Sequence, residues 1–152
     1  MKAPSSAGRA RELPRASYLI KELERAVRAR IDEVVRPLRL TAVQYTALSV
    51  LALQPGMSSA QLARRSFVSP QASNEMVSVL ERRGLIVRHV DRDGGRALGI
   101  FLTALGERTL SKCDDQLDLI ETRMFGKMTL RERAHFRGML RTCRDAVRQR
   151  GE

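Results

Sequence analysis

Apolar residues recur along this chain at two different spacings, which together predict helices and one pair of β-strands. Steps of three and four residues, typical of one face of an α-helix, run through 17–36, 42–54, 59–65, 70–83, 104–125 and 130–147. Segments 85–90 and 98–102 are instead rich in strand-forming residues, and turn formers at 91–95 join them as a hairpin. The predicted fold class is therefore mainly α with a small β-hairpin.

Helix-boundary residues support these segments. A hydroxyl residue followed three positions later by Gln or Glu predicts a capping box at a helix start. In a capping box, the side chain of each of the two residues accepts a hydrogen bond from the backbone N–H of the other. The pairs at this spacing are Thr41–Gln44, Ser58–Gln61 and Thr129–Glu132. Ser69 and Pro70 supply a cap followed by proline in the first turn, and Gly84 is placed to end that helix in a left-handed conformation.

Length and charge distribution predict one domain. The 152 residues suit a single domain, and a hydrophobic share of 43 % is enough for a core. Residues 1–14 lack periodicity and are expected to form a flexible basic arm, which leaves 15–152 as the domain. Residues 41–57 carry no charge of either sign, so this block is expected to be the most buried.

The net charge of +11 favours a polyanionic partner, of which nucleic acid is the commonest. Codon bias is an alternative source, because 24 of the 28 basic residues are Arg. Two cysteines are too few for a disulfide framework, which indicates a reducing compartment. We find neither a secretory signal nor an apolar stretch long enough to span a bilayer, so we expect a cytoplasmic protein with no membrane role.

The order of elements is that of a winged helix-turn-helix, in which two helices joined by a tight turn precede a β-hairpin. The second helix of such a pair enters the DNA major groove with its N-terminal residues on base edges. Here that stretch has no acidic residue before Glu75, and the amides of Gln71 and Asn74 can each bond bidentately to adenine. The candidate base-reading residues are Ser69, Gln71, Ala72, Ser73 and Asn74. The alternative is an ordinary solvated helix surface.

Arginines flank this helix. The candidates for phosphate contacts are Arg64, Arg65, Arg82, Arg83 and Arg88. Such contacts supply much of the affinity for DNA without reading its sequence. Arg92 and Arg96 lie at the tip and shoulder of the hairpin, where a wing follows the minor groove and Arg is favoured. Each arginine taken singly is also compatible with a solvated surface position.

Five segments resemble the MarR (multiple antibiotic resistance regulator) family of bacterial transcription regulators. They are Leu40–Tyr45, Ser59–Arg65, Val68–Ser73, Leu80–Ile86 and Leu102–Gly106, in order and at matching spacing. The resemblance implies a homodimer in which the helices of 15–40 and 104–152 intertwine, while 41–103 form the DNA-binding unit. It also implies that two recognition helices read a pseudo-palindrome in double-stranded DNA, with half-sites ~10 bp apart.

The hairpin tip departs from the family pattern. Family wings usually carry an Asp-Arg-Arg-like tip, and the three matching positions here are Gly94, Gly95 and Arg96. Only the minor-groove arginine is kept, and Asp91 or Asp93 would have to replace the acidic residue that orients it. This difference predicts a weaker contribution of the wing to binding.

Members of the family usually respond to a small molecule, often phenolic or otherwise aromatic and anionic, held between the dimerisation helices and the DNA-binding unit. The resemblance therefore implies a ligand-responsive repressor with Tyr18, Arg28 and Tyr45 as candidate pocket residues; core or surface positions are the alternative for each. Some relatives sense oxidants through an N-terminal cysteine, which this chain lacks. Cys113 and Cys143 lie on apolar stripes, where a cysteine is usually an inert hydrophobe.

Catalysis and metal binding find little support. The two histidines, His89 and His135, have no metal-ligating residues at suitable spacing, and no Gly-rich phosphate loop follows a strand. We therefore expect no catalytic residue, no metal site and no cofactor. The alternative function is an effector-independent winged-helix module for protein association or nonspecific DNA binding.

Overall fold

The computed structural model of the chain describes residues 14–90 and 98–148, and its elements follow the predicted order. The helices are α1 (Ala16–Val35), α2 (Ala42–Leu53), α3 (Ser59–Arg65), α4 (Pro70–Arg82), α5 (Ala104–Phe125) and α6 (Leu130–Arg148), with a 3₁₀ turn η1 (Arg36–Leu38) after α1. The strands are β1 (Ile86–Val90) and β2 (Leu98–Leu102). They pair antiparallel, so the predicted fold class is confirmed. Residues 1–13, most of the predicted arm, lie outside the described residues.

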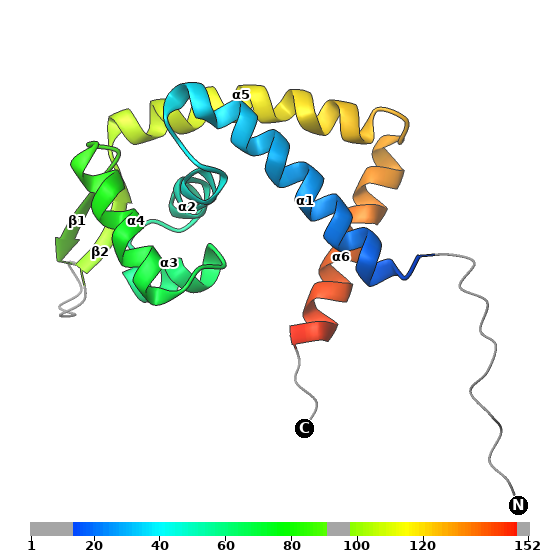
Figure 1. Ribbon diagram of the computed structural model, residues 1–152, viewed down its shortest axis with the longest axis horizontal. Helices are drawn as coiled ribbons and strands as arrows, with labels where there is room; N and C mark the ends of the chain where they lie inside the picture. Colours follow the sequence, from blue (N-terminus) through cyan, green and yellow to red (C-terminus); the bar gives the residue numbers. More distant parts are fainter. Residues whose placement is uncertain (1–13, 91–97, 149–152) are drawn as a thin grey trace, which may run out of the picture.

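Figure 1 shows how the elements divide in space. The short helices α3 and α4 and the hairpin gather at one end of the molecule, whereas α6 lies at the other end. The long helices α1 and α5 connect the two ends, and they pack against each other and against α2. The helix-turn-helix and hairpin therefore lie at the opposite end of the molecule from α6.

Capping residues begin the helices at the predicted positions. Thr41 Oγ1 accepts a hydrogen bond from the Gln44 N–H at 3.2 Å, and Gln44 Oε1 accepts from the Thr41 N–H at 3.1 Å. The same reciprocal pair begins α3, and Ser69 Oγ accepts from the Ala72 N–H at 3.1 Å to begin α4. Such a cap stabilises a helix by about 1 kcal/mol. Gly84 follows α4 with a φ of +69°, as predicted.

Only part of the uncharged block 41–57 lies in the core, since residues 52–55 at the end of α2 are exposed. Within α2, Leu48 and Leu51 are fully buried, and each contributes about 1.5–3 kcal/mol through removal of its side chain from water. The hairpin joins this core through Ile100, whose N–H donates to the Met57 carbonyl at 2.9 Å. The Ile100 carbonyl in turn accepts from the Gly56 N–H at 2.9 Å. These two bonds fix the hairpin relative to the segment that leads into α3.

Some helix and strand positions do not follow a simple rule of apolar residues inside and polar residues outside. On α4, Ala72 is exposed, whereas its neighbour Ser73 is fully buried. The reason is that the buried apolar residues of α4 lie three, four and seven positions after Ser73, which puts Ser73 on their face of the helix. Ala60 is likewise exposed on α3. On β2, Leu98 is half exposed because the last residue pair of the hairpin extends beyond the core.

Apolar side chains stay exposed on the long helices. Between Leu130 and Arg148, α6 buries no residue, although its apolar side chains follow one face. Further exposed apolar residues lie on the first half of α1, at the start of α5 and on its second half. The large exposed side chains of these three helices are Tyr18, Leu19, Ile20, Leu23, Leu105, Leu119, Met124, Leu130, Met139, Leu140 and Val147. Monomeric proteins rarely leave a large contiguous apolar patch in water, so these faces have the character of a surface that another chain covers.

Candidate nucleic-acid interface

The turn between α3 and α4 sets the direction of α4. Phe67 in this turn has a φ of +58°, a left-handed conformation that costs a residue with a side chain roughly 1–2 kcal/mol. Ser69 then caps α4, and the first turn of α4 carries no acidic side chain. Free N–H groups and the helix dipole at such an end favour a negatively charged partner.

Two exposed amides follow on the outer face of α4. Asn74 Oδ1 accepts a hydrogen bond from Ser59 Oγ at 2.5 Å, which holds the amide in one orientation against α3. Gln71 is held only by a long hydrogen bond of 3.4 Å from its Nε2 to the Glu75 carboxylate. An amide can pair with adenine because it offers a donor and an acceptor side by side. Asn74 is therefore pre-oriented for such a contact, whereas Gln71 can still rotate.

The prediction that Ser73 contacts bases is wrong. Its side chain is fully buried, and its Oγ donates to the Ser59 carbonyl at 3.1 Å. The residue therefore fastens α4 to α3. Ser69 and Ala72 are exposed at the start of α4, as a contact with DNA requires.

The arginines beside α4 fall into two groups. Arg64 and Arg65 at the end of α3 and Arg82 at the end of α4 are exposed. Arg83 has a structural role rather than a free guanidinium for phosphate. Its guanidinium donates hydrogen bonds to the carbonyls of Arg39 and Leu38 at 2.5 and 2.9 Å. It thereby ties the end of α4 to the turn that precedes α2.

Arg88 on β1 already has an anionic partner. Its guanidinium donates to both carboxylate oxygens of Glu81, at 3.2 and 2.5 Å. The hydrogen bond from Arg88 lowers the pKa of the Glu81 carboxyl below its usual value. A phosphate at Arg88 would have to share the guanidinium with this carboxylate. The candidate wing residues Arg92 and Arg96, together with Gly94 and Gly95, lie outside the described residues.

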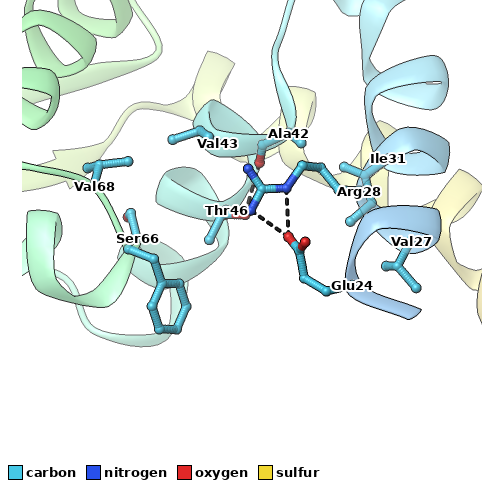
Figure 2. A pocket seen from close by; sticks show the side chains of 10 residues that line it. Glu24, Val27, Arg28, Ile31, Ala42, Val43, Thr46, Ser66 and Val68 are labelled. Carbon is cyan, nitrogen blue, oxygen red and sulfur yellow. Dashed lines mark hydrogen bonds and ion pairs between the residues drawn. The ribbon is translucent and has the colours of Figure 1, made fainter. Parts of the chain in front are cut away.

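A pocket of about 490 Å³ lies between α1, α2 and the helix-turn-helix turn (Figure 2). Its lining residues are Glu24, Val27, Arg28, Ile31, Ala42, Val43, Thr46, Ser66, Phe67 and Val68. Arg28 is the basic group among them, and its Nε donates to the Glu24 carboxylate at 2.7 Å. Apolar walls with a few polar groups are typical of small-molecule sites. The pocket therefore lies where the helix from the chain start meets the unit that carries α4.

Of the three candidate pocket residues, the structure places only Arg28 in this pocket. Tyr18 is 56 % exposed near the start of α1. Tyr45 is on the side of α2 that faces α5, where its hydroxyl donates to the Asp114 carboxylate at 2.9 Å. Burial, with a smaller effect of Asp114, raises the pKa of Tyr45 to about 12. Tyr18 and Tyr45 therefore lie outside this pocket, and their assignment as ligand-binding residues stays a prediction.

The two cysteines differ in environment. Cys113 is buried in α5, and this burial raises the pKa of its thiol to about 11, so almost none is the reactive thiolate at neutral pH. Cys143 is exposed on α6. Within residues 14–90 and 98–148, no three His, Cys, Asp or Glu side chains cluster as metal ligands would. None of the described helices is long and apolar enough to cross a membrane.

Ser59, Ser66 and Phe67 are the residues of this region that sequence reasoning missed. The contact between Ser59 and Asn74 arises from the docking of α3 on α4, and a separation of fifteen residues carries no periodic signal. One signal was available for Phe67. Turns of this kind often contain glycine, and residues 66–69 contain none, so a residue with a side chain has to adopt the left-handed conformation there.

Comparisons with known proteins agree with this architecture. A family model described as MarR family matches residues 40–97. The HTH-type transcriptional repressor Rv2887 of Mycobacterium tuberculosis is 31 % identical over 123 residues, which are 81 % of this chain and 88 % of that protein. Its crystal structure with salicylic acid is 29 % identical and covers 87 % of this chain and 98 % of its own, with a TM-score of 0.70. A structure of Rv2887 with DNA is 28 % identical, covers 86 % and 98 %, and has a TM-score of 0.69.

These matches span the helix-turn-helix and most of the helices around it. The relatives are transcription regulators, a class distinct from enzymes. The order of helices, the hairpin after α4 and the similarity over four fifths of the sequence lead to one conclusion: this chain belongs to the MarR family.

Proposed function

We propose that this protein is a sequence-specific, ligand-responsive repressor that binds double-stranded DNA as a homodimer. The observation that carries the proposal is the start of α4, which is exposed, free of acidic residues in its first turn, and presents an amide pre-oriented by Ser59. The relative Rv2887 has been solved with DNA, which supports the same use of this helix here. Its place of action would be the bacterial cytoplasm, where genomic DNA lies, and no catalytic activity is needed for this function.

Each part of the surface has its own role in this proposal. Asn74 and Gln71 read base edges in the major groove, with Ser69 and Ala72 close to the same edges. Arg64, Arg65 and Arg82 contact phosphates, which adds affinity without sequence preference. Arg88 does so while it keeps part of its pairing with Glu81. Arg92 and Arg96 reach the minor groove from the hairpin.

The homodimer follows from the exposed apolar faces of α1, α5 and α6. Because no residue of α6 is fully buried by the described part of its own chain, a second copy is the partner that we propose for it. In this arrangement 15–40 and 104–152 form the dimer, and 41–103 form the DNA-binding unit. Two recognition helices related by a two-fold axis would read a pseudo-palindrome with half-sites ~10 bp apart.

The pocket beside Arg28 is the proposed effector site. Rv2887 has been solved with salicylic acid and with p-aminosalicylic acid, both of which are aromatic carboxylic acids. In this chain the carboxylate of such a ligand would take the place of Glu24 on the Arg28 guanidinium. A ligand bound between α1 and the turn before α4 changes operator affinity if it favours one spacing of the two recognition helices.

Selection from a random DNA library tests the DNA-binding part. Purified protein at ~150 mM salt should enrich a pseudo-palindromic site and bind it ~10³-fold or more tightly than random duplex. Equal affinity for selected and random DNA would instead support the alternative module for protein association or nonspecific DNA binding.

Release from the selected site tests the effector part. Titration with salicylate should lower operator affinity in the wild-type protein. The Arg28→Gln variant should bind DNA normally but need a higher salicylate concentration for release, because a neutral amide pairs less strongly with a carboxylate. If the variant and the wild type respond identically, Arg28 does not hold the effector.

A further inference from the structure

Arg83 connects the end of α4 to the segment that follows α1. Its Nη1 donates to the Arg39 carbonyl at 2.5 Å and its Nη2 to the Leu38 carbonyl at 2.9 Å, although these residues lie 44 and 45 positions apart in sequence. In the part of the chain that the structure describes, these are the two hydrogen bonds that join residues 14–41 to residues 66–102. Both donors belong to one planar guanidinium, which fixes direction as well as distance.

The carbonyls that accept from Arg83 are themselves fastened to α1. The Arg39 N–H donates to the Arg36 carbonyl at 2.8 Å, and the Leu40 N–H donates to the Val35 carbonyl at 3.2 Å. Arg39 also has a φ of +56°, a left-handed conformation that a residue with a side chain keeps only where its surroundings hold it. Residues 36–40 therefore form a rigid extension of α1.

A second bond joins α1 to the DNA-binding unit close to the chain connection. Asp32 Oδ1 accepts from the Ala42 N–H at 2.7 Å, which fixes the start of α2 at the end of α1. One attachment beside the connection leaves rotation about it to be limited by apolar packing, which is not directional. The Arg83 contact adds a directional attachment from a different element, so it opposes that rotation.

The recognition helix has no comparable direct attachment to α1. It packs mainly on α3 and β1, which belong to the same unit. From residues 36–40, α1 runs towards the end of the molecule where α6 lies (Figure 1). Arg83 therefore joins the helix proposed to read DNA directly to a helix proposed to form the dimer.

We infer that Arg83 is a positioning residue, which sets the direction of α4 relative to α1 and so the distance between the two recognition helices of the dimer. This inference rests on the proposed homodimer that reads two half-sites. It gives Arg83 a part in the selection of half-site spacing, in place of the phosphate contact expected from the sequence.

Palindromes of different spacing test this inference with the full-length protein. One base pair removed from or added to the centre of the selected site shifts the half-sites by about 3.4 Å and turns them by about 35° relative to each other. The wild type should bind the selected spacing at least ~10-fold more tightly than either altered spacing, because only the selected one allows both helices to engage. In Arg83→Gln this preference should fall to about 3-fold or less through weaker binding of the selected site, with single half-site affinity unchanged.

Arg82→Gln is the matched control, since it removes the same charge from the exposed neighbouring residue. It should weaken binding of all three palindromes and of the single half-site by a similar factor, because a phosphate contact carries no information on spacing. Arg83→Lys keeps the charge but lacks the planar pair of donors, so its spacing preference should lie between those of the wild type and Arg83→Gln.

Each other outcome is decisive. A wild-type spacing preference in Arg83→Gln would overturn the inference. A uniform loss like that of Arg82→Gln would also overturn it, and so would weaker binding of the single half-site alone. If Arg83→Gln does not fold, Arg83→Lys decides, and a full wild-type preference there contradicts the inference. If the wild type binds all three spacings equally, the proposed reading of two half-sites fails and the inference fails with it.

Discussion

Asn74 is held by one hydrogen bond from a neighbouring helix, and the role in base recognition that we propose for it can be tested directly. A pre-oriented amide loses little side-chain entropy when it pairs with a base. We expect Asn74→Ala to weaken binding to the selected site by about 1–3 kcal/mol and binding to random duplex much less. Fluorescence anisotropy with both duplexes at the same salt concentration measures the two losses.

Ser59→Ala provides the matched control for this prediction. It keeps the Asn74 amide but removes the hydroxyl that orients it, so the loss at the selected site should have the same direction and a smaller size. Equal losses on selected and random DNA in Asn74→Ala would show that the residue contributes only to general affinity.

Tyr45 gives a pH-dependent prediction. Burial raises the pKa of its phenol from 10.0 to about 12 in the folded chain, so the folded state keeps this proton more tightly than the unfolded state does. The stabilisation is therefore complete below pH 10 and is lost as the pH rises towards 12. In Tyr18→Phe, where Tyr45 is the remaining tyrosine, the tyrosinate absorbance should appear with a midpoint about two pH units above that of free tyrosine.

Urea denaturation completes this test. Between pH 9 and pH 11.5 the wild type should lose more stability than Tyr45→Phe, which has no phenol to ionise. The same loss in both proteins would mean that other groups control the alkaline transition.

At the scale of elements, α5 approaches the segment before β1 closely at Gly106. A Cβ atom added to Gly106 would lie 2.0 Å from the Leu85 carbonyl oxygen, far inside van der Waals contact. Gly106→Ala should therefore destabilise the protein by about 1–3 kcal/mol or more, because backbone has to move to make room. Thermal unfolding measures this loss.

Gly138→Ala is the matched control for Gly106→Ala. Nothing lies within 4 Å of a Cβ placed on Gly138, which is an interior residue of α6. The same substitution should there raise stability by roughly 0.5–1 kcal/mol, the usual gain from replacing glycine in a helix. A comparable loss at both positions would contradict the close approach at Gly106.

The comparison of sequence and structure is also clearest at this scale. Helix starts were predictable because capping is local: Thr41 and Ser69 bond to residues three positions away. The burial of Ser73 was not predictable from the sequence, because a serine interrupts the apolar periodicity of the helix. The hydrogen-bond partner of Ser73 is also on another helix, at the Ser59 carbonyl. The position of α4 was therefore predictable, but not which of its residues faces inward.

The pocket shows the same limit more strongly. Its wall combines α1, α2 and the turn after α3, so no single segment carries a signal for it. Arg28 was identified through the family resemblance, whereas the place of Ser66 in the wall becomes visible only when the three segments are packed together.

At the scale of the whole molecule, the apolar face of α6 has no covering partner among the described residues. Leu140 and Val147 on this face are 40 % and 84 % exposed. If the face is a dimer contact, a charge placed in its middle would be buried without a partner, at a high cost in free energy. Leu140→Glu should therefore sediment as a monomer at concentrations where the wild type is a dimer, with its helical circular dichroism largely kept.

Loss of the dimer has a second consequence that a local effect on folding would not produce. A dimer engages two half-sites at once, and this linkage multiplies affinity by roughly 10²–10⁴. Leu140→Glu should lose at least ~100-fold in affinity for the palindrome but bind a single half-site as the wild type does, because α4 is far from the substitution (Figure 1). Thr142→Glu carries the same charge two residues along, on the opposite side of α6, and should remain dimeric. If both variants stay dimeric, the partner surface lies elsewhere, and the pairing of two recognition helices needs another origin.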